Sequence, residues 1–388
     1  MHEGNSTVNY LTRVVSSLAE IGQQSWDELL ASQPDANPFL SFGFLHALHE
    51  SGSAAAASGW EPRFLTVWRD DRLEAAMPLY LKHHSYGEYV FDWAWADAYR
   101  RHGYDYYPKL LSSIPFTPVT GSRLITRDTE SAGELLQALV DFQASAGLSS
   151  THVLYLPERE AALLGQHDFM LRSNVQFHWL NDGYRNFDDF LDTLDRKKRK
   201  NIRAERRKVA EAGVSFRRVS GSKATVEDWR FFVRCYTRTY AAHYSTPYLN
   251  LDFFLRIGAA IPENILLVIA EREGEPIASS LLIHNEAVLY GRYWGAITDL
   301  PCLHFETAYY QPLEFCIARQ ISRFEGGAQG EHKMARGFLP HKTWSAHWLA
   351  HPAFADAVEL FLARESNGID AYIDELNDHT PYRDRSNF

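Results

Sequence analysis

The sequence predicts an α/β (α+β) protein of two domains, each a mixed β-sheet flanked by helices. The chain has 388 residues, which is more than one domain usually holds. Hydrophobic residues make up 45% of it, enough to fill substantial cores. Both halves show the same order of expected elements: three antiparallel strands, a helix, a strand, a connection and a further strand. Because antiparallel hairpins followed by a parallel crossover give a mixed sheet, this order predicts the same fold twice.

The first half begins with two short helices, and the second of them starts at Asn37-Pro38. Runs rich in aromatic and branched residues predict strands at 63–69, 73–82, 88–95 and 117–125. Apolar residues then recur at helical spacing over 131–146, and Gly147 ends that helix. The half closes with a strand at 152–157, a short helix at 158–165 and a strand at 173–181.

The second half opens with a long charged helix over 187–212, which Gly213 ends. A helix at 225–244 follows, with Thr225 and Asp228 spaced as in a capping box. Strands are predicted at 215–220, 264–272, 276–285, 287–296, 321–325 and 343–350, and helices at 248–262, 303–320 and 353–364. Pro312 is expected to kink or divide its helix. We place the domains at 1–182 and 183–388.

Charge and cysteine content argue against several classes of protein. The net charge of −10 disfavours attraction of the whole protein to nucleic acid or anionic lipid. The three cysteines, Cys235, Cys302 and Cys316, form no CxxC pair, as is typical of a reducing compartment. The sequence shows no signal-peptide pattern and no run of about 18 apolar residues. We therefore expect a cytoplasmic protein without a transmembrane segment.

Several long and unusual sequence segments resemble the FemAB-like family of bacterial proteins, and the resemblance covers roughly residues 20–365. They include PFLSFGFLHALHESGSA, DRKKRKNIRAERRKV, CLHFETAYYQ and FEGGAQGEHKMARGF. The resemblance implies two GNAT-like domains and a role in peptidoglycan biosynthesis or recognition. Fem enzymes transfer an aminoacyl group from tRNA to the peptide of a cell-wall precursor, whereas relatives in the wider superfamily use acyl-CoA. The resemblance therefore implies a muropeptide-like acceptor and leaves the donor open between acyl-CoA and aminoacyl-tRNA.

The segment around residues 287–306 carries candidate groups for acyl transfer to an amine. Strict alternation along the strand would place Arg292 between two aromatic residues on one face, either as a phosphate ligand or as a side chain lying along aromatic surface. The loop after the strand holds the donor pyrophosphate in GNAT-like folds, but here it lacks a glycine-rich cradle, which disfavours CoA. His304 or Glu306 would accept the amine proton, although Glu306 also suits a helix start electrostatically. Cys302, His304 and Glu306 could together suggest a metal site, but no second group of ligands at metal-binding spacing accompanies them, so we expect no metal.

The loop EGGAQGEHKMARGF, residues 325–338, is the second candidate segment. Glu325 ends the preceding strand and is a catalytic candidate, and Gly326-Gly327 allow the backbone to approach a ligand closely. Gln329 and the glycine backbone would polarise the carbonyl group of the donor. A phosphate or carboxylate would be held by four basic residues, Arg292, His332, Lys333 and Arg336. The alternative is a turn whose charges are simply solvated.

Basic residues crowd the run from Arg196 to Lys208, which includes Arg199 and Arg203. Their mutual repulsion favours an anionic partner such as tRNA, CoA or a lipid- or nucleotide-linked diphosphate, or contact with the membrane surface; a solvated helix face is the alternative. In the first half, Asp92 is expected to be either a satisfied structural group or an acid of the site, and Lys109 is expected to contribute to the site with it. The function predicted is N-acyl or aminoacyl transfer, with a non-catalytic recognition module and a tRNA-dependent transferase as alternatives.

Overall fold

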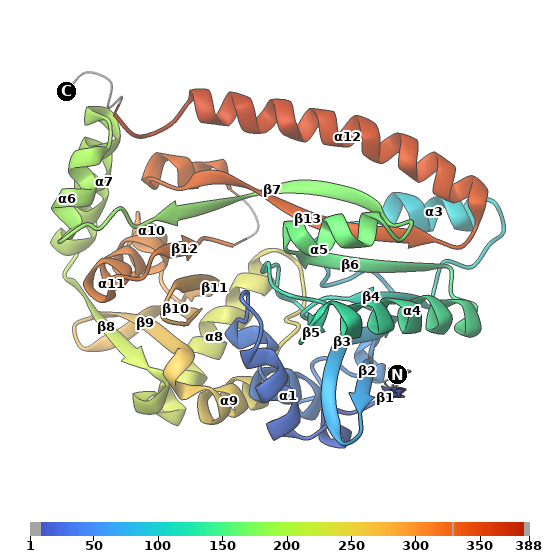
Figure 1. Ribbon diagram of the computed structural model, residues 1–388. Helices are drawn as coiled ribbons and strands as arrows, with labels where there is room; N and C mark the ends of the chain where they lie inside the picture. Colours follow the sequence, from blue (N-terminus) through green and yellow to red (C-terminus); the bar gives the residue numbers. More distant parts are fainter. Residues whose placement is uncertain (1–8, 328–329, 384–388) are drawn as a thin grey trace, which may run out of the picture. The chain divides into compact units, whose positions relative to one another are not determined.

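The computed structural model describes residues 9–327 and 330–383, which form two compact units (Figure 1). Unit 1 consists of the chain up to Ser173 together with Thr343–Ser366. Unit 2 consists of Asn174–Lys342 together with the residues from Asn367 onwards. A single division of the chain after residue 182 stays a prediction.

The sheet of unit 1 is antiparallel except at one pair of strands. Its order is β1-β2-β3-β4-β6-β13, and β5 pairs with β3. Strands β4 and β6 are parallel. The strands are β1 (Tyr10–Val15), β2 (Trp60–Arg69), β3 (Arg72–Lys82), β4 (Lys109–Ser112), β5 (Ile125–Thr126), β6 (Ser150–Leu156) and β13 (Leu339–Leu349).

Helices cover both faces of this sheet. The helices of the first 165 residues are α1 (Gln23–Ala31), α2 (Phe42–Glu50), α3 (Trp93–Arg101), α4 (Thr129–Ala146) and α5 (Glu158–Gly165). Leu135 and Leu139 of α4 pack in one core cluster with Leu65 of β2. The adjacent residue Phe64 points to the other face, where its ring meets that of Trp26 in α1 at 5.7 Å. Side chains that alternate along β2 therefore pack against helices on both faces of the sheet.

The sheet of unit 2 repeats this plan. Its order is β7-β12-β11-β10-β9-β8, with β11 and β12 parallel and the other pairs antiparallel. The strands are β7 (Met170–Leu180), β8 (Val214–Ser220), β9 (Ile265–Arg272), β10 (Glu275–His284), β11 (Val288–Ala296) and β12 (Arg323–Glu325). The predicted class of mixed sheets flanked by helices is confirmed in both units.

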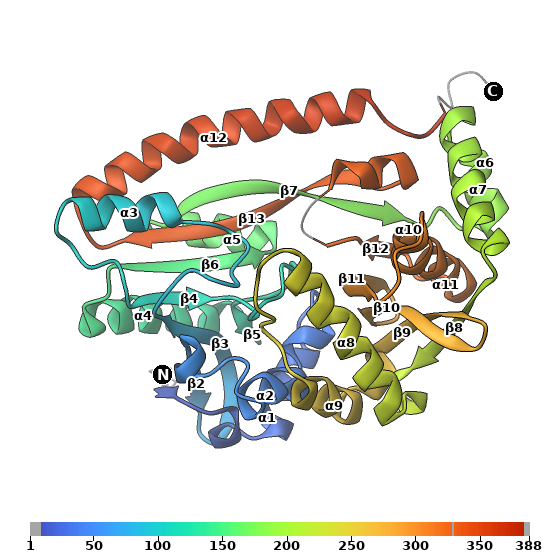
Figure 2. The ribbon, with the colours of Figure 1, turned by 180° about the vertical axis from the view of Figure 1, so that it is seen from behind.

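Helices again lie on both faces, as Figure 2 shows for α8 and α9 on one side of β9–β11 and α10 and α11 on the other. The helical segments of this part of the chain are α6 (Phe187–Thr193), α7 (Arg196–Glu211), α8 (Val226–Ala242), α9 (Leu251–Ala260), α10 (Leu303–Phe305), the π-helical turn η6 (Glu306–Tyr310), α11 (Gln311–Arg319), the 3-10 helix η7 (Glu331–Arg336) and α12 (Pro352–Asp378). The face toward α10 and α11 holds a core cluster with Leu289, Phe324 and Leu313.

The last strand of each sheet comes from a distant part of the sequence. In unit 1, residues 344–349 of β13 pair with β6. In unit 2, residues 178–180 of β7 pair with β12. The strand predicted at 173–181 thus completes the second sheet, and the strand predicted at 343–350 completes the first.

Two of the predicted strands in the first half are wrong. Residues 88–92 are irregular and α3 begins at Trp93, with Asp92, Trp95 and Tyr99 buried at helical spacing. Of the strand predicted at 117–125, only β5 forms at its end. The preceding loop is held instead by the buried guanidinium of Arg123, which donates to carbonyl oxygens of Val119 and Gly121 at 2.9 Å. Strands β1 and β4 were not predicted.

Two long predicted helices are divided. The charged helix breaks at Leu194, whose backbone is extended, and so becomes α6 and α7. The helix predicted over 303–320 becomes α10, η6 and α11. The division that Pro312 predicts is confirmed: because this residue has no N–H, the regular hydrogen-bond ladder is interrupted just before it, and the π-helical turn lies there.

Candidate active site in unit 2

The parallel strands β11 and β12 separate after three paired residues. Their ladder runs from Val288–Arg323 to Tyr290–Glu325, whereas β11 continues to Ala296. A cavity of about 310 Å³, here called the gap cavity, opens where they part. It is lined by Ser280, Leu281, Leu282, Gly291, Arg292, Tyr293, Trp294, His304, Ala308, Tyr309, Phe324, Gly326, Gly327, His332 and Lys333. Six of the residues predicted for the site therefore meet at this cavity.

A β-bulge at Arg292 shapes one wall of the gap cavity. On β10, Leu281 pairs with Tyr293 and Leu282 pairs with Gly291, so Arg292 has no paired position. The extra residue reverses the alternation along β11. The expected alternation of Arg292 with two aromatic residues on one face is therefore wrong. The Arg292 guanidinium instead lies over the ring of Tyr293, 5.0 Å from its centre.

Glycines line the gap, where a side chain would be crowded at Gly326 and strained at Gly327. A Cβ atom on Gly326 would lie 3.0 Å from the Phe338 ring and 3.1 Å from Lys333 Cδ. Gly327 has a φ of +84°, a conformation that favours glycine. The backbone of this segment is thus open to a ligand in the gap cavity. Gln329, the other residue predicted to polarise a carbonyl here, lies outside the described residues.

Lys333 is a buried ammonium group at the wall of the gap cavity. Its side chain donates from Nζ to the carbonyl oxygen of Gly327 at 2.9 Å. No carboxylate of the described residues forms an ion pair with it. Burial lowers the pKa of Lys333 to about 8. The group is therefore still mainly cationic at neutral pH and can face negative charge that develops in the cavity.

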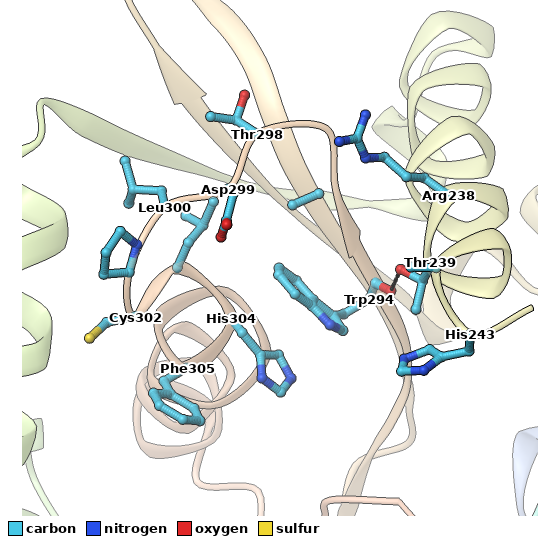
Figure 3. Close-up of a pocket in the computed structure, with 14 residues that line it drawn as sticks. Arg238, Thr239, His243, Trp294, Thr298, Asp299, Leu300, Cys302, His304 and Phe305 are labelled. Atoms are coloured by element: carbon cyan, nitrogen blue, oxygen red, sulfur yellow. Dashed lines mark hydrogen bonds between the residues drawn. The ribbon is translucent and has the colours of Figure 1, made fainter.

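His304 and Trp294 line both the gap cavity and a second cavity of about 500 Å³, here called the outer cavity (Figure 3). Their rings lie 4.5 Å apart. Figure 3 shows the outer cavity between the loop from Thr298 to Cys302 and the end of α8. Burial, with the nearby charges of Lys333 and other basic groups, lowers the pKa of His304 to about 4, so its imidazole is neutral at pH 7.

Glu306 is held by other side chains and does not line either cavity. It is buried and lies 3.0 Å from Arg206 Nη2. It also accepts a hydrogen bond of 2.8 Å from Gln311. Because both interactions occupy its carboxylate, Glu306 has a structural role in holding α7 against the helical segment of residues 303–319.

The η7 segment is fixed to α7 through Arg336. Arg336 donates to both carboxylate oxygens of Glu205 at 3.0 Å and lies over the Phe305 ring. His332, one turn earlier, lies 3.3 Å from the Tyr309 hydroxyl. Arg336 thus holds the backbone that presents Lys333, while His332 reaches the gap cavity itself.

Glu325 does not line the gap cavity, although Gly326, the next residue, does, and the side chain of Glu325 lies on the sheet face opposite the core residue Phe324. It pairs with Arg323, whose Nη2 atom is 3.0 Å from its Oε1. In the register of the sheet, its neighbour on β7 is His178. Sequence reasoning missed His178, Trp294 and Tyr309. The alternation of Gln176 and His178 with Phe177 and Trp179 was a usable signal of a strand with one polar face.

Asp92 and Lys109 lie in unit 1 and bind each other. Lys109 is fully buried and forms ion pairs with Asp92 and, at 2.8 Å, with Glu88. It also donates to Ser85 at 2.9 Å. Burial by itself would raise the pKa of Asp92, but the Lys109 ammonium outweighs it and holds that pKa well below its usual range. The two groups pair with each other, although Asp92 Oδ1 has no hydrogen-bond partner among the described residues, and a substrate role for them stays a prediction.

The basic run forms α7 and turns many of its charges outward. The exposed residues are Arg196, Lys197, Lys200, Arg203, Arg207 and Lys208. Of the two predicted ligands, Arg199 pairs with Asp192 at 3.2 Å and Arg203 with Asp188 at 3.0 Å. The inner face carries Glu205 and Arg206, which bind the elements around the gap cavity.

Residues 9–327 and 330–383 contain neither a metal-binding cluster nor a membrane-spanning helix. No group of three or more His, Cys, Asp or Glu side chains in these ranges is placed to hold a metal ion. The helices of the same ranges are too short or too polar to cross a membrane.

Comparisons with known proteins point in one direction. A family model described as FemAB-like, peptidoglycan biosynthesis/recognition, matches residues 17–384. No curated sequence matches the chain. Among solved structures, FemX is similar with a TM-score of 0.55 at 10% identity, covering 89% of this chain and all (100%) of that one.

Two further solved structures share the fold. The C-terminal domain of a putative lysylphosphatidylglycerol synthetase from Agrobacterium fabrum has a TM-score of 0.53 at 12% identity, covering 90% of this chain and 97% of that one. L-PGS from Bacillus licheniformis has a TM-score of 0.51 at 12% identity, covering 88% and 97%. At these identities the likeness concerns the fold, and it agrees with the tandem plan of the two sheets.

Proposed function

Because this chain belongs to the FemAB-like family of peptidoglycan biosynthesis and recognition proteins, we propose that it transfers an acyl or aminoacyl group to an amine. The acceptor is a peptidoglycan precursor or a related cell-envelope molecule, and the reaction takes place in the cytoplasm. The observation that carries the proposal is the gap cavity, where a buried ammonium, an open glycine backbone and a neutral imidazole surround one space. The name of the putative lysylphosphatidylglycerol synthetase, which shares the fold, supports lysyl transfer as one form of this chemistry.

In the proposed reaction, the carbonyl group of the donor lies in the gap cavity. The amine attacks the carbonyl carbon, a C–N bond forms, and the bond between the carbonyl and its carrier breaks. Negative charge develops on the carbonyl oxygen, and Lys333 with the Gly326-Gly327 backbone stabilises it. His304 remains neutral and orients the donor from the wall that the two cavities share.

The carrier of the acyl group occupies the outer cavity. Its walls include the aromatic side chains of Trp294 and Phe305, and Arg238 and His243 lie at the other side. The loop beside them, residues 297–302, contains no glycine, and Pro301 has no backbone N–H, so it forms no glycine-rich cradle for a diphosphate. Aminoacyl-tRNA is therefore favoured over acyl-CoA.

The exposed face of α7 gives this preference a second basis. Its inner face is bonded to η6 and η7, which contribute residues to the gap cavity, and its outer face carries exposed cations. A polyanionic carrier such as tRNA would relieve their repulsion. Replacing Lys197, Lys200, Arg207 and Lys208 with Gln should weaken use of aminoacyl-tRNA and flatten its dependence on salt. Use of acetyl-CoA should be unaffected.

The test is turnover with defined donors. We would incubate the purified protein with a UDP-linked muropeptide and either acetyl-CoA or charged tRNA, and weigh the muropeptide by mass spectrometry. An added acyl or aminoacyl mass supports the proposal. Thermal stabilisation by the muropeptide with no added mass from either donor would instead indicate a non-catalytic recognition module.

A further inference from the structure

Three polar side chains form one row across neighbouring strands of unit 2. His178 on β7, Glu325 on β12 and Tyr290 on β11 are paired in register, so their side chains share one face of the sheet. The adjacent row belongs to the apolar core on the other face and consists of Trp179, Phe324 and Leu289. The polar row is thus set apart from the core by the alternation of the strands.

Two members of the polar row carry buried atoms that lack hydrogen bonds. His178 is 4% exposed and Glu325 is 3% exposed. Among the residues described by the structure, both ring nitrogens of His178 and the Oε2 atom of Glu325 lack a hydrogen-bond partner. The 3.9 Å between His178 Nε2 and Glu325 Oε2 is too long for a hydrogen bond. Because buried polar atoms are nearly always bonded, these three atoms point to a ligand.

The charged groups around the row leave it ready to accept a proton. Burial raises the pKa of Glu325 to about 7, although Arg323 and Arg292 oppose the rise. Burial and three nearby basic groups, His341, Arg323 and Lys333, keep the pKa of His178 well below its ordinary value. The His341 ring stacks on that of His178 at 4.3 Å. Near pH 7, the row therefore offers a neutral imidazole and a carboxyl group that exchanges its proton.

The side chains of the row do not line the gap cavity, but two of its residues directly precede residues that do. Tyr290 and Glu325 are the last paired residues, and the next residues on both strands, Gly291 and Gly326, line the cavity. One residue along a strand is about 3.3 Å. Because neither glycine has a side chain, no side chain of these two residues separates the row from a carbonyl in the gap.

We propose that Glu325 binds the primary amine of the acceptor and takes its proton, and that His178 positions this amine. This inference rests on the function proposed above and adds the acceptor site. The carboxylate oxygen and the unprotonated imidazole nitrogen are hydrogen-bond acceptors, as the N–H groups of an alkylamine require. One proton passes from the ammonium to Glu325, the freed electron pair attacks the donor carbonyl, and a C–N bond replaces the C–O or C–S bond to the carrier. The second proton leaves with the hydroxyl or thiol of the carrier.

The first test compares two nucleophiles in the full-length protein. Glu325→Gln should reduce transfer to the muropeptide amine by at least about 100-fold, the usual contribution of a general base. Transfer to hydroxylamine, which is already unprotonated at neutral pH, should fall much less. Glu286→Gln, an exposed carboxylate of the same unit, is the matched control. Equal losses with both nucleophiles, or unchanged transfer to the muropeptide, would overturn the assignment.

His178→Asn tests the positioning role. It should raise the KM for the muropeptide by about tenfold and change kcat less, because the proton acceptor remains. The rising limb of the pH–rate profile should stay in this variant and disappear in Glu325→Gln. A shift of the limb in His178→Asn would instead assign the proton transfer to the imidazole.

A binding measurement keeps this inference separate from the proposed function. In protein labelled with 15N-histidine, Nα-acetyllysine should shift the imidazole signals assigned through His178→Asn, and the shift should be lost in Glu325→Gln. If the wild type transfers no acyl group but shows this shift, the amine site stands and the proposed reaction falls. If the wild type is active and no shift occurs at any amine concentration, the proposed amine site is wrong and the proposed function is unaffected.

Discussion

Lys333 Nζ donates a hydrogen bond to the carbonyl oxygen of Gly327 across 2.9 Å, which fixes a buried cation beside the glycine backbone. The bond uses one of its three N–H groups and leaves two for a ligand. Replacing this lysine with Ala should lower kcat by about 100- to 1000-fold, as expected when one donor to a developing oxyanion is lost. The muropeptide transfer assay measures it, and Lys342→Ala, whose ammonium pairs with Asp370, is the control. A kcat for Lys333→Ala equal to that of the control would remove Lys333 from the site.

The rate of transfer should show a narrow maximum between pH 7 and 8. Glu325 must be ionised to accept a proton, so the rate rises as the pH passes its pKa of about 7. Lys333 must be protonated, so the rate falls as the pH passes its pKa of about 8. His304, with a pKa of about 4, should contribute no limb above pH 5.5. Lys333→Arg should move the falling limb to higher pH, and an unmoved limb would assign it to another group.

Glu325→Gln should stabilise the protein at pH 8. Burial raises the pKa of Glu325 from 4.5 to about 7, so the folded state binds this proton more tightly than the unfolded state does. The stability of the wild type therefore falls as the pH rises from 4.5 to 7, by an amount on the order of 3 kcal/mol. Urea denaturation should show a free energy of unfolding about 1–3 kcal/mol higher for the variant than for the wild type at pH 8. The gain is smaller than the full amount because Arg323 loses its carboxylate partner. The difference should shrink toward pH 4.5. A variant less stable than the wild type at pH 8 would contradict the raised pKa.

Glu306→Ala should destabilise the fold and serves as the contrast to Glu325. It removes the buried partner of Arg206, which keeps a second contact with Glu314 at 2.7 Å. Loss of one partner of a buried ion pair costs about 3–5 kcal/mol, and the remaining contact should reduce this to about 2–3 kcal/mol. Unfolding in urea measures the change, with Glu286→Ala as the control. A loss of activity with unchanged stability would instead favour a catalytic Glu306.

Much of unit 2 could be predicted because its strands have regular patterns. The strand predicted at 287–296 differs from β11 by one residue, and Gly326, Gly327, His332 and Lys333 lie at the cavity that the glycine-rich loop suggested. The bulge at Arg292 could not be predicted because it depends on the register with β10. A single inserted residue changes the face of every residue after it.

Other features depend on contacts between distant residues. Glu306 and Arg206 are far apart in the sequence, so nothing local indicated that this carboxylate is already paired. His178 looked like an ordinary strand residue until the register placed it beside Glu325. The false strand at 88–95 came from its aromatic content, which also suits an amphipathic helix, and the burial of Trp95 and Tyr99 one turn apart decided the matter.

The exchanged last strands have a consequence for how the protein is made. Translation supplies residues from the N-terminus, and domains commonly fold as they emerge from the ribosome. Here β6 must wait for residues 344–349 of β13, which are synthesised only after nearly all of unit 2. The nascent chain therefore holds an unfinished sheet edge during most of its synthesis, and such edges invite aggregation. We expect the nascent chain to need chaperones at the ribosome. Expression of residues 1–182 alone would leave the edge of β6 permanently unpaired.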